Sequence, residues 1–336
     1  MQFEKLDREG IGTSSMSRQP MYKHLDTETG KRTAIRRLLL KPELQDSFSQ
    51  SAGLPSSNSA QEEDYGVPCM TIREVSLLKV MNHKNVARLV HVEPDNEDRF
   101  LRLYLEYAGE DMTTFLKKNP KRASDPKVIK DLLKQLLDGV NHYHSAKAAH
   151  GNLRAHNVLI ELDTRSDRSE EEVQCNLLIT NLQLVTDASA YRAPELLLGS
   201  KKLTPAADMF SVGCIFYEML MKKSLFDADD KLDIIFRLMG TPNEDNWPGV
   251  TQLYGEKLSK YRKYSTMDLS EVVSDLESAG VDLLSKLLCL DPSKRVTAAD
   301  ALKHGYFANV NPKQPPETTT AATASSSAST SASVNP

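Results

Sequence analysis

The sequence predicts an α+β fold, in which a small β-rich part of about 110 residues precedes a larger helix-rich part. Hydrophobic residues make up 40% of the 336 residues, which is enough to bury a core. Short strand-like runs flank a polar turn near the N-terminus, whereas apolar residues recur at helical spacing in the second part. These two patterns together indicate the α+β class.

A β-hairpin is predicted near the N-terminus. Residues 22–25 and 32–40 flank the polar segment 26–30, which ends in a glycine, and such a turn between two runs is typical of a hairpin. Residues 71–81 carry apolar side chains at helical spacing. They predict the one clear helix of the β-rich part.

Two helices of the second part begin with a capping residue followed by proline. Asp125 precedes Pro126, which opens a long stripe of apolar residues, and Thr204 precedes Pro205. The second helix, which runs to Leu220, is apolar on nearly every side. We therefore expect it to be buried on most sides.

Two segments differ in composition from the rest. Residues 43–66 are rich in Ser, Gln, Asn and acids without a lasting period, and they predict an inserted flexible loop. Residues 311–336 are mostly Thr, Ala and Ser, and they predict a disordered tail.

Charge and cysteine content exclude several classes of function. With 42 Lys+Arg against 46 Asp+Glu, the net charge of −4 argues against a nucleic-acid or membrane binder that works by bulk attraction. The four cysteines are scattered without a Cys-x-x-Cys pair, so neither a disulfide framework nor a zinc site is indicated. A charged N-terminus and the lack of a long apolar run predict a cytoplasmic or nuclear protein.

Five short motifs follow one another in a characteristic order. They are Gly10-Ile11-Gly12-Thr13, Ala34-Ile35-Arg36, Glu74 on the next helix, residues 150–157 (HGNLRAHN) and residues 191–195 (YRAPE). The two glycines alone would be read as ordinary turn glycines. A series in this order resembles the protein-kinase motif set.

Further motifs resemble the cyclin-dependent kinases within that family. Residues 68–74 (PCMTIRE) are similar to the cyclin-contacting helix, and other similar segments are YRAPELLLG (191–199), DMFSVGCI (208–215), GTP (240–242) and LDPSKRVTA (290–298). The resemblance covers about residues 3–308 and implies a bilobal kinase fold. It implies an N-lobe over residues 1–108 and a C-lobe over residues 109–310.

The catalytic loop departs from the family at the residues that carry the chemistry. Asn152 stands where the family has the aspartate that accepts the proton of the substrate hydroxyl, and a carboxamide has no basic site near neutral pH. Arg154 replaces the neighbouring lysine, and Gly151 replaces an arginine. The resemblance therefore implies a degenerate catalytic site.

The positions for phosphate and metal are also altered. Arg36 replaces the lysine that contacts the phosphates, although it can still pair with Glu74. Asn157, the position of one metal ligand, is retained, whereas Asn181 replaces the metal-binding aspartate. Because Mg²⁺ prefers charged oxygen ligands, we expect ATP and Mg²⁺ to bind weakly or not at all.

The remaining nucleotide positions are partly kept. The glycine loop retains Gly10 and Gly12 but has Ser14 to Met16 where the third glycine is expected. By resemblance, the adenine-sized pocket is formed by Ala34, Leu159, a hinge at Glu106 and Ala108, and Asp111.

Structural parts of the family are retained. By resemblance, Asp208 bonds the backbone of the catalytic loop, and Glu195 pairs with Arg295. His150 is expected to bond backbone rather than bind a metal, because the nearby histidines lack carboxylate or thiol partners at metal-ligand spacing.

The favoured function is a catalytically inactive binding module. The cyclin-facing helix, with Pro68, Ile72 and Arg73, predicts a cyclin or cyclin-like protein partner. Two alternatives stay open at this point. One is a weakly active ATP-dependent serine/threonine kinase, and the other is a switch that binds ATP without transferring phosphate.

Overall fold

The computed structural model describes residues 3–5, 22–25, 32–39, 69–95, 100–107, 109–163, 173–180, 190–226 and 230–308. Several predicted features lie outside these ranges, namely the 43–66 loop, the 311–336 tail, Gly10, Gly12, Pro68, Ala108 and Asn181. The boundaries of the two lobes at residues 108 and 310 stay predictions.

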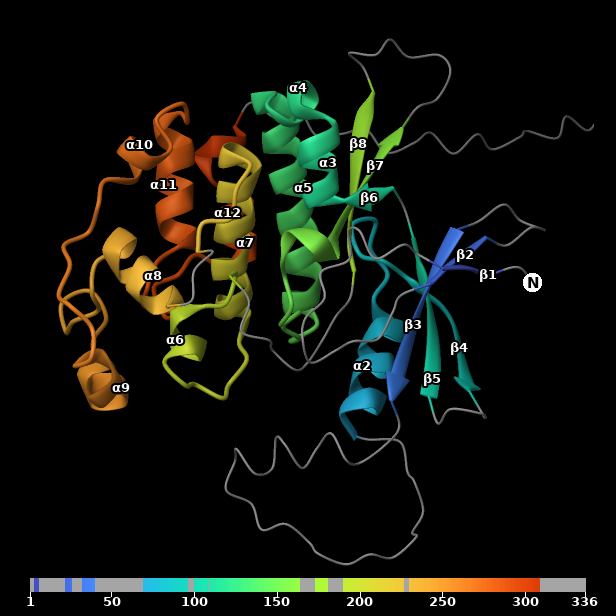
Figure 1. Ribbon diagram of the computed structural model, residues 1–336, viewed down its shortest axis with the longest axis horizontal. Coiled ribbons are helices and arrows are strands. Elements are labelled where there is room, and N and C mark those ends of the chain that lie inside the picture. Colours follow the sequence, from blue (N-terminus) through green and yellow to red (C-terminus); the bar gives the residue numbers. More distant parts are fainter. Residues whose placement is uncertain are drawn as a thin grey trace, which may run out of the picture.

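An antiparallel sheet of five strands forms the N-terminal lobe, in the order β1-β2-β3-β5-β4 (Figure 1). Its strands are β1 (Phe3–Lys5), β2 (Tyr22–Leu25), β3 (Arg32–Leu39), β4 (Leu89–Asp95) and β5 (Phe100–Glu106). The predicted hairpin is confirmed, because β2 and β3 pair antiparallel with Tyr22 opposite Ile35.

One helix, α2 (Cys69–Val80), lies beside this sheet (Figure 1). It confirms the helix predicted over residues 71–81. Glu74 and Leu78 are buried on its inner side, whereas Ile72 and Arg73 are exposed. The helix therefore presents one side to the core of the lobe and another to solvent.

Helices dominate the second lobe, which confirms the α+β class. They are α3 (Met112–Lys118), α4 (Pro120–Ala123), α5 (Pro126–Ser145), α6 (Pro194–Leu197), α7 (Pro205–Met221), α8 (Lys231–Met239), α9 (Val250–Leu258), α10 (Leu269–Val272), α11 (Ser278–Leu287), α12 (Ala298–Ala301) and the short 3₁₀ helices η1 (Ala155–Asn157) and η3 (Gly305–Phe307).

Both predicted helix starts are confirmed at the atomic level. The Asp125 carboxylate accepts a hydrogen bond from the Lys127 N–H at the start of α5, 2.8 Å away. The Thr204 hydroxyl accepts one from the Ala207 N–H at the start of α7. Most of α7 is buried, as its composition predicts, and it packs against α5 and α11.

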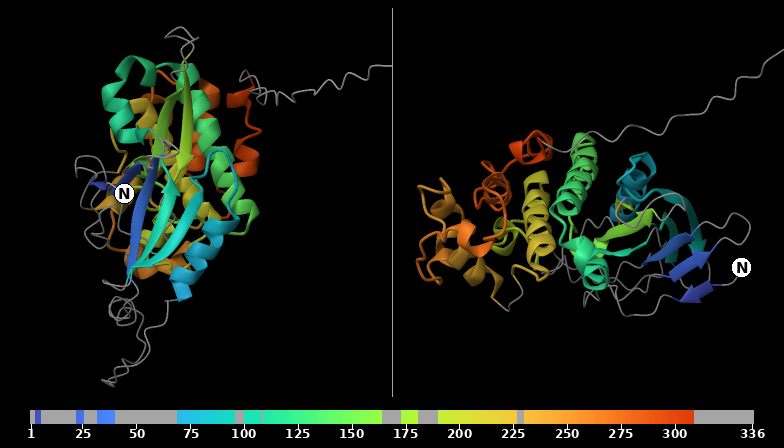
Figure 2. Two further views of the ribbon diagram at one scale, coloured as in Figure 1. Left: turned by 90° about the vertical axis from the view of Figure 1, so that its right-hand side faces the viewer. Right: turned by 90° about the horizontal axis from the view of Figure 1, so that it is seen from above.

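A small antiparallel sheet joins the two lobes. Its strands, β6 (Glu110–Asp111), β7 (Val158–Asp163) and β8 (Gln174–Ile179), lie in that order next to α5. The right-hand view of Figure 2 places the five-stranded sheet on one side of these strands and α5 with the other helices of the second lobe on the other. In the part of the chain that the structure describes, no helix combines the length and apolar character needed to cross a membrane.

Candidate functional site

A buried carboxylate binds the backbone at the start of the catalytic-loop segment. Asp208, in the first turn of α7, accepts hydrogen bonds from the backbone N–H of His150 at 2.7 Å and of Gly151 at 2.9 Å. The imidazole of His144 lies 3.0 Å from the same carboxylate. Asp208 thus holds the start of the loop, as the resemblance implied.

His150 is held as a neutral ring. Its Nε2 lies 3.1 Å from the carbonyl oxygen of Thr180, which can only accept, and its Nδ1 lies 3.2 Å from the backbone N–H of Asn152, which can only donate. These two partners together require a proton on Nε2 and none on Nδ1. Complete burial lowers the pKa of His150 to about 4. The expectation that His150 bonds backbone is confirmed.

Asn152 and Asn157 are brought together in the loop. The Asn157 side-chain amide donates to the Asn152 carbonyl at 2.7 Å, and the Asn157 carbonyl accepts from the Thr180 N–H at 2.9 Å. The Asn157 N–H donates to the carbonyl of Arg154, the residue before η1. Asn157 therefore holds the backbone of the loop at position 152, where the Asn152 residue itself is buried.

An ion pair joins β3 to α2. The Arg36 guanidinium donates to the Glu74 carboxylate, and both side chains are largely buried. Burial raises the pKa of the Glu74 carboxyl, and the charge and hydrogen bond of Arg36 offset only part of that rise. The predicted pairing of these two residues is confirmed.

The other described positions that the resemblance assigns to the nucleotide lie in two sheets. In the N-terminal sheet, Ala34 is buried on β3 and Glu106 is half-buried on β5, the strand that pairs with β3. In the small sheet, Leu159 on β7 stands opposite Asp111 on β6. The Asp111 carboxylate accepts hydrogen bonds from the N–H and the hydroxyl of Thr114, so it caps α3.

A small cavity opens beside the catalytic loop. It has a volume of about 20 Å³, and its lining includes Gly151, Asn152, Tyr191 and Arg192. This volume is room for about one water molecule. The cavity lies on the side of the loop that faces the segment before α6.

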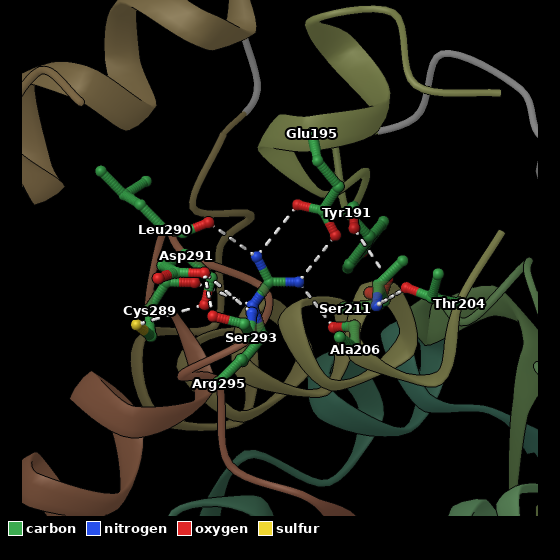
Figure 3. Close-up of polar contacts among 11 residues, drawn as sticks. Tyr191, Glu195, Thr204, Ala206, Ser211, Cys289, Leu290, Asp291, Ser293 and Arg295 are labelled. Atoms are coloured by element: carbon green, nitrogen blue, oxygen red, sulfur yellow. Dashed lines mark hydrogen bonds and ion pairs between the residues drawn. The ribbon is translucent and has the colours of Figure 1, made fainter. Parts of the chain in front are cut away.

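Arg295 is surrounded by acceptors in the core of the helical lobe (Figure 3). Its two terminal nitrogens donate to the two oxygens of Glu195 at 2.9 and 3.0 Å, and its Nε donates to the Cys289 carbonyl at 2.8 Å. The carbonyls of Ala206 and Leu290 accept further hydrogen bonds. The Glu195–Arg295 pair that the resemblance implied is confirmed.

One buried polar network was not anticipated from the sequence. The Asn85 side chain donates to the Gln135 side chain on α5 at 3.0 Å and to the Leu177 carbonyl on β8 at 2.9 Å. Gln135 in turn donates to the Cys175 carbonyl at 2.8 Å. The only signal in the sequence is a glutamine within an apolar stripe, which does not name its partners.

A second unanticipated contact joins Tyr191 to Glu218. The Tyr191 hydroxyl donates to the Glu218 carboxylate at 2.5 Å, and the Thr113 hydroxyl lies 3.5 Å from the other carboxylate oxygen. Burial raises the pKa of both Tyr191 and Glu218. The contact links the segment before α6 to the end of α7.

A comparison with protein-family models agrees with this arrangement. The model described as the protein kinase domain matches residues 56–307, which is more than half of the chain. The matched range begins after β3 and includes α2, the catalytic loop, Asp208 and the Glu195–Arg295 pair. The chain therefore belongs to the protein kinase family, and its α+β architecture is the bilobal kinase fold.

Proposed function

We propose that this member of the protein kinase family is a cyclin-dependent-kinase-like pseudokinase that acts as a regulatory or scaffolding binding module. One observation carries the proposal. The catalytic loop is held in place through Asp208, His150 and Asn157, yet position 152 within it carries a carboxamide instead of a general base. A catalytic loop that keeps its backbone hydrogen bonds but lacks the general base is what we expect of an inactive kinase.

The phosphate and metal positions support the same proposal. Arg36 is engaged with Glu74, and its planar fork does not replace a lysine ammonium as a point charge over the phosphates. Asn157 and Asn181 would offer Mg²⁺ only neutral amide oxygens. In this proposal ATP and Mg²⁺ bind weakly or not at all.

The test of inactivity is a radiometric phosphotransfer assay with labelled ATP and Mg²⁺ on the purified protein. We expect no transfer above that of an Asn157→Ala control, because loss of general-base catalysis typically costs about 10²–10⁴-fold in rate. Thermal melts must show that both proteins are folded, since Asn157 also bonds the loop backbone. Transfer by the natural protein that Asn157→Ala abolishes would instead establish the weakly active serine/threonine kinase.

The proposed partner is a cyclin or cyclin-like protein that binds α2. The resemblance of residues 68–74 to the cyclin-contacting helix motivates this choice. Ile72 supports it, because its side chain is 54% exposed on the solvent side of α2 with Arg73 exposed beside it. Because a fully exposed isoleucine gains about 1.5–3 kcal/mol on burial, covering the 54% of Ile72 that is exposed contributes about half of that.

Replacing Ile72 by glutamate is expected to weaken binding to a purified cyclin by at least about tenfold, which corresponds to about 1.4 kcal/mol. The matched control is Val90→Glu on β4, since Val90 is also 54% exposed. We expect the control to bind like the natural protein in biolayer interferometry against a panel of cyclins. Equal weakening by both variants, or no binding to any cyclin, would contradict the proposed partner.

A further inference from the structure

A cluster of cations, here called the basic face, lies on the helical lobe. Lys201 and Lys202 follow α6, whereas the other four lie at the end of α9 and in the turn after it, at Lys257, Lys260, Arg262 and Lys263. All six side chains are exposed. Figure 1 shows α9 at the end of the helical lobe that is farthest from the N-terminal sheet.

The two segments of the basic face are neighbours in space. A Cβ atom at Gly199 would lie 2.7 Å from the Lys257 ammonium nitrogen, so this ammonium lies directly over the Gly199 backbone. Gly199 adopts a φ of +109°, which favours glycine. Lys201 and Lys202 follow within three residues, and the Lys260 N–H bonds the Lys257 carbonyl, so the chain turns back next to α9.

The described carboxylates near the basic face bond tyrosines and form no ion pair with its six cations. Asp230 accepts a hydrogen bond from the Tyr261 hydroxyl at 3.3 Å, and Asp233 accepts one from the Tyr264 hydroxyl at 2.9 Å. Within residues 198–204 and 250–267 the only acid is Glu256. None of the six cations forms an ion pair with another described residue, whereas Lys118 on α3 pairs with Glu110 at 3.0 Å. The six exposed cations therefore give this face a local positive charge, although the chain as a whole carries a net charge of −4.

We propose that the basic face binds an acidic segment of a partner protein, rich in Asp and Glu and containing an apolar residue. The charge of the face is complementary to such a segment. Leu253 adds an apolar contact, since it is 66% exposed on α9, one helical turn before Lys257. This surface is separate from α2, so the inference does not depend on a cyclin partner.

The aromatic side chains of this region favour a protein partner over a nucleic acid. Single-stranded nucleic acids stack their bases on exposed aromatic faces. Two of the three tyrosines of the region pack on other rings instead, with Tyr254 edge-on to Trp247 and Tyr261 edge-on to Phe236. The guanidinium groups of Arg237 and Arg262 lie 5.6 and 5.9 Å from the ring centre of the third, Tyr264. Five of the six cations are lysines, whose ammonium groups attract carboxylates as point charges.

The experiment measures fluorescence anisotropy with a labelled synthetic peptide of Asp and Glu residues around one leucine. We expect the full chain to bind it and to lose affinity as salt rises from about 0.05 M to about 0.5 M, because salt screens exposed charges. The double variant Lys201→Glu/Lys257→Glu should weaken binding by at least about tenfold. Leu253→Ser should weaken it less, by about threefold.

The matched control is Lys121→Glu/Lys127→Glu, which makes the same change in net charge at exposed positions on α4 and α5. It should bind the peptide within about twofold of the natural protein. A peptide with Gln and Asn in place of the acids should not bind. Equal weakening by the two double variants, no binding of the acidic peptide, or tighter binding of a single-stranded RNA of equal charge would overturn the proposal.

Discussion

Replacing Arg295 by alanine is expected to destabilise the protein by about 3–5 kcal/mol, because the change leaves a buried carboxylate without its partner. The Arg295 side chain has no exposed surface, and the Glu195 side chain is only 6% exposed. The carbonyls of Cys289, Leu290 and Ala206 lose a donor as well. Urea unfolding followed by circular dichroism measures the loss.

The control for this prediction is Arg237→Ala. Arg237 also pairs with a carboxylate, that of Asp233 at 2.7 Å, but the Arg237 side chain is 62% exposed. Solvent screens such a pair, so we expect only a small loss of stability. If the Arg295 variant were no less stable than the Arg237 variant, the Glu195–Arg295 pair would not hold the helical lobe together.

The protein should lose stability as the pH falls from about 6.5 towards 4, and His150 accounts for about 3 kcal/mol of this loss. The folded state holds the His150 pKa below its unfolded value, so the unfolded state binds the proton more readily in this range. The contribution is fully present above pH 6.5 and is lost as the ring becomes protonated. Protonation of Nδ1 also removes the acceptor for the Asn152 N–H.

Because other groups titrate in the same range, the measurement is a difference between the natural protein and His150→Gln. Burial also lowers the pKa of His83 and His156, whereas it raises the pKa of Glu74 and Glu218. Free energies of unfolding at several pH values for both proteins isolate the contribution of His150. Parallel pH profiles would show that His150 is not the group responsible.

Local signals in the sequence predicted much of the fold. The Asp125-Pro126 and Thr204-Pro205 pairs marked the starts of α5 and α7, because a cap and an N1 proline act on backbone groups only a few residues away. The polar turn between β2 and β3 marked the hairpin for the same reason. Such signals depend on neighbours along the chain.

The order of the motifs, through its resemblance to the kinase family, predicted part of the site. It identified the partners Arg36 and Glu74, and Glu195 and Arg295, although 38 and 100 residues separate them. It did not indicate the link of Asn85 to Gln135, or that of Tyr191 to Glu218. These contacts depend on which side chains meet after α5 and α7 have packed, and a single sequence contains no record of that packing.

The sequence by itself determined the chemistry available at each position of the site. A carboxamide at Asn152 lacks a basic site whatever surrounds it, because basicity is a property of the side chain. Only the tertiary structure decided the environment of these groups, such as the burial that keeps His150 neutral and the approach of Lys257 to Gly199. Burial and proximity arise from contacts between segments far apart in the chain, so they exist only once the lobes have folded.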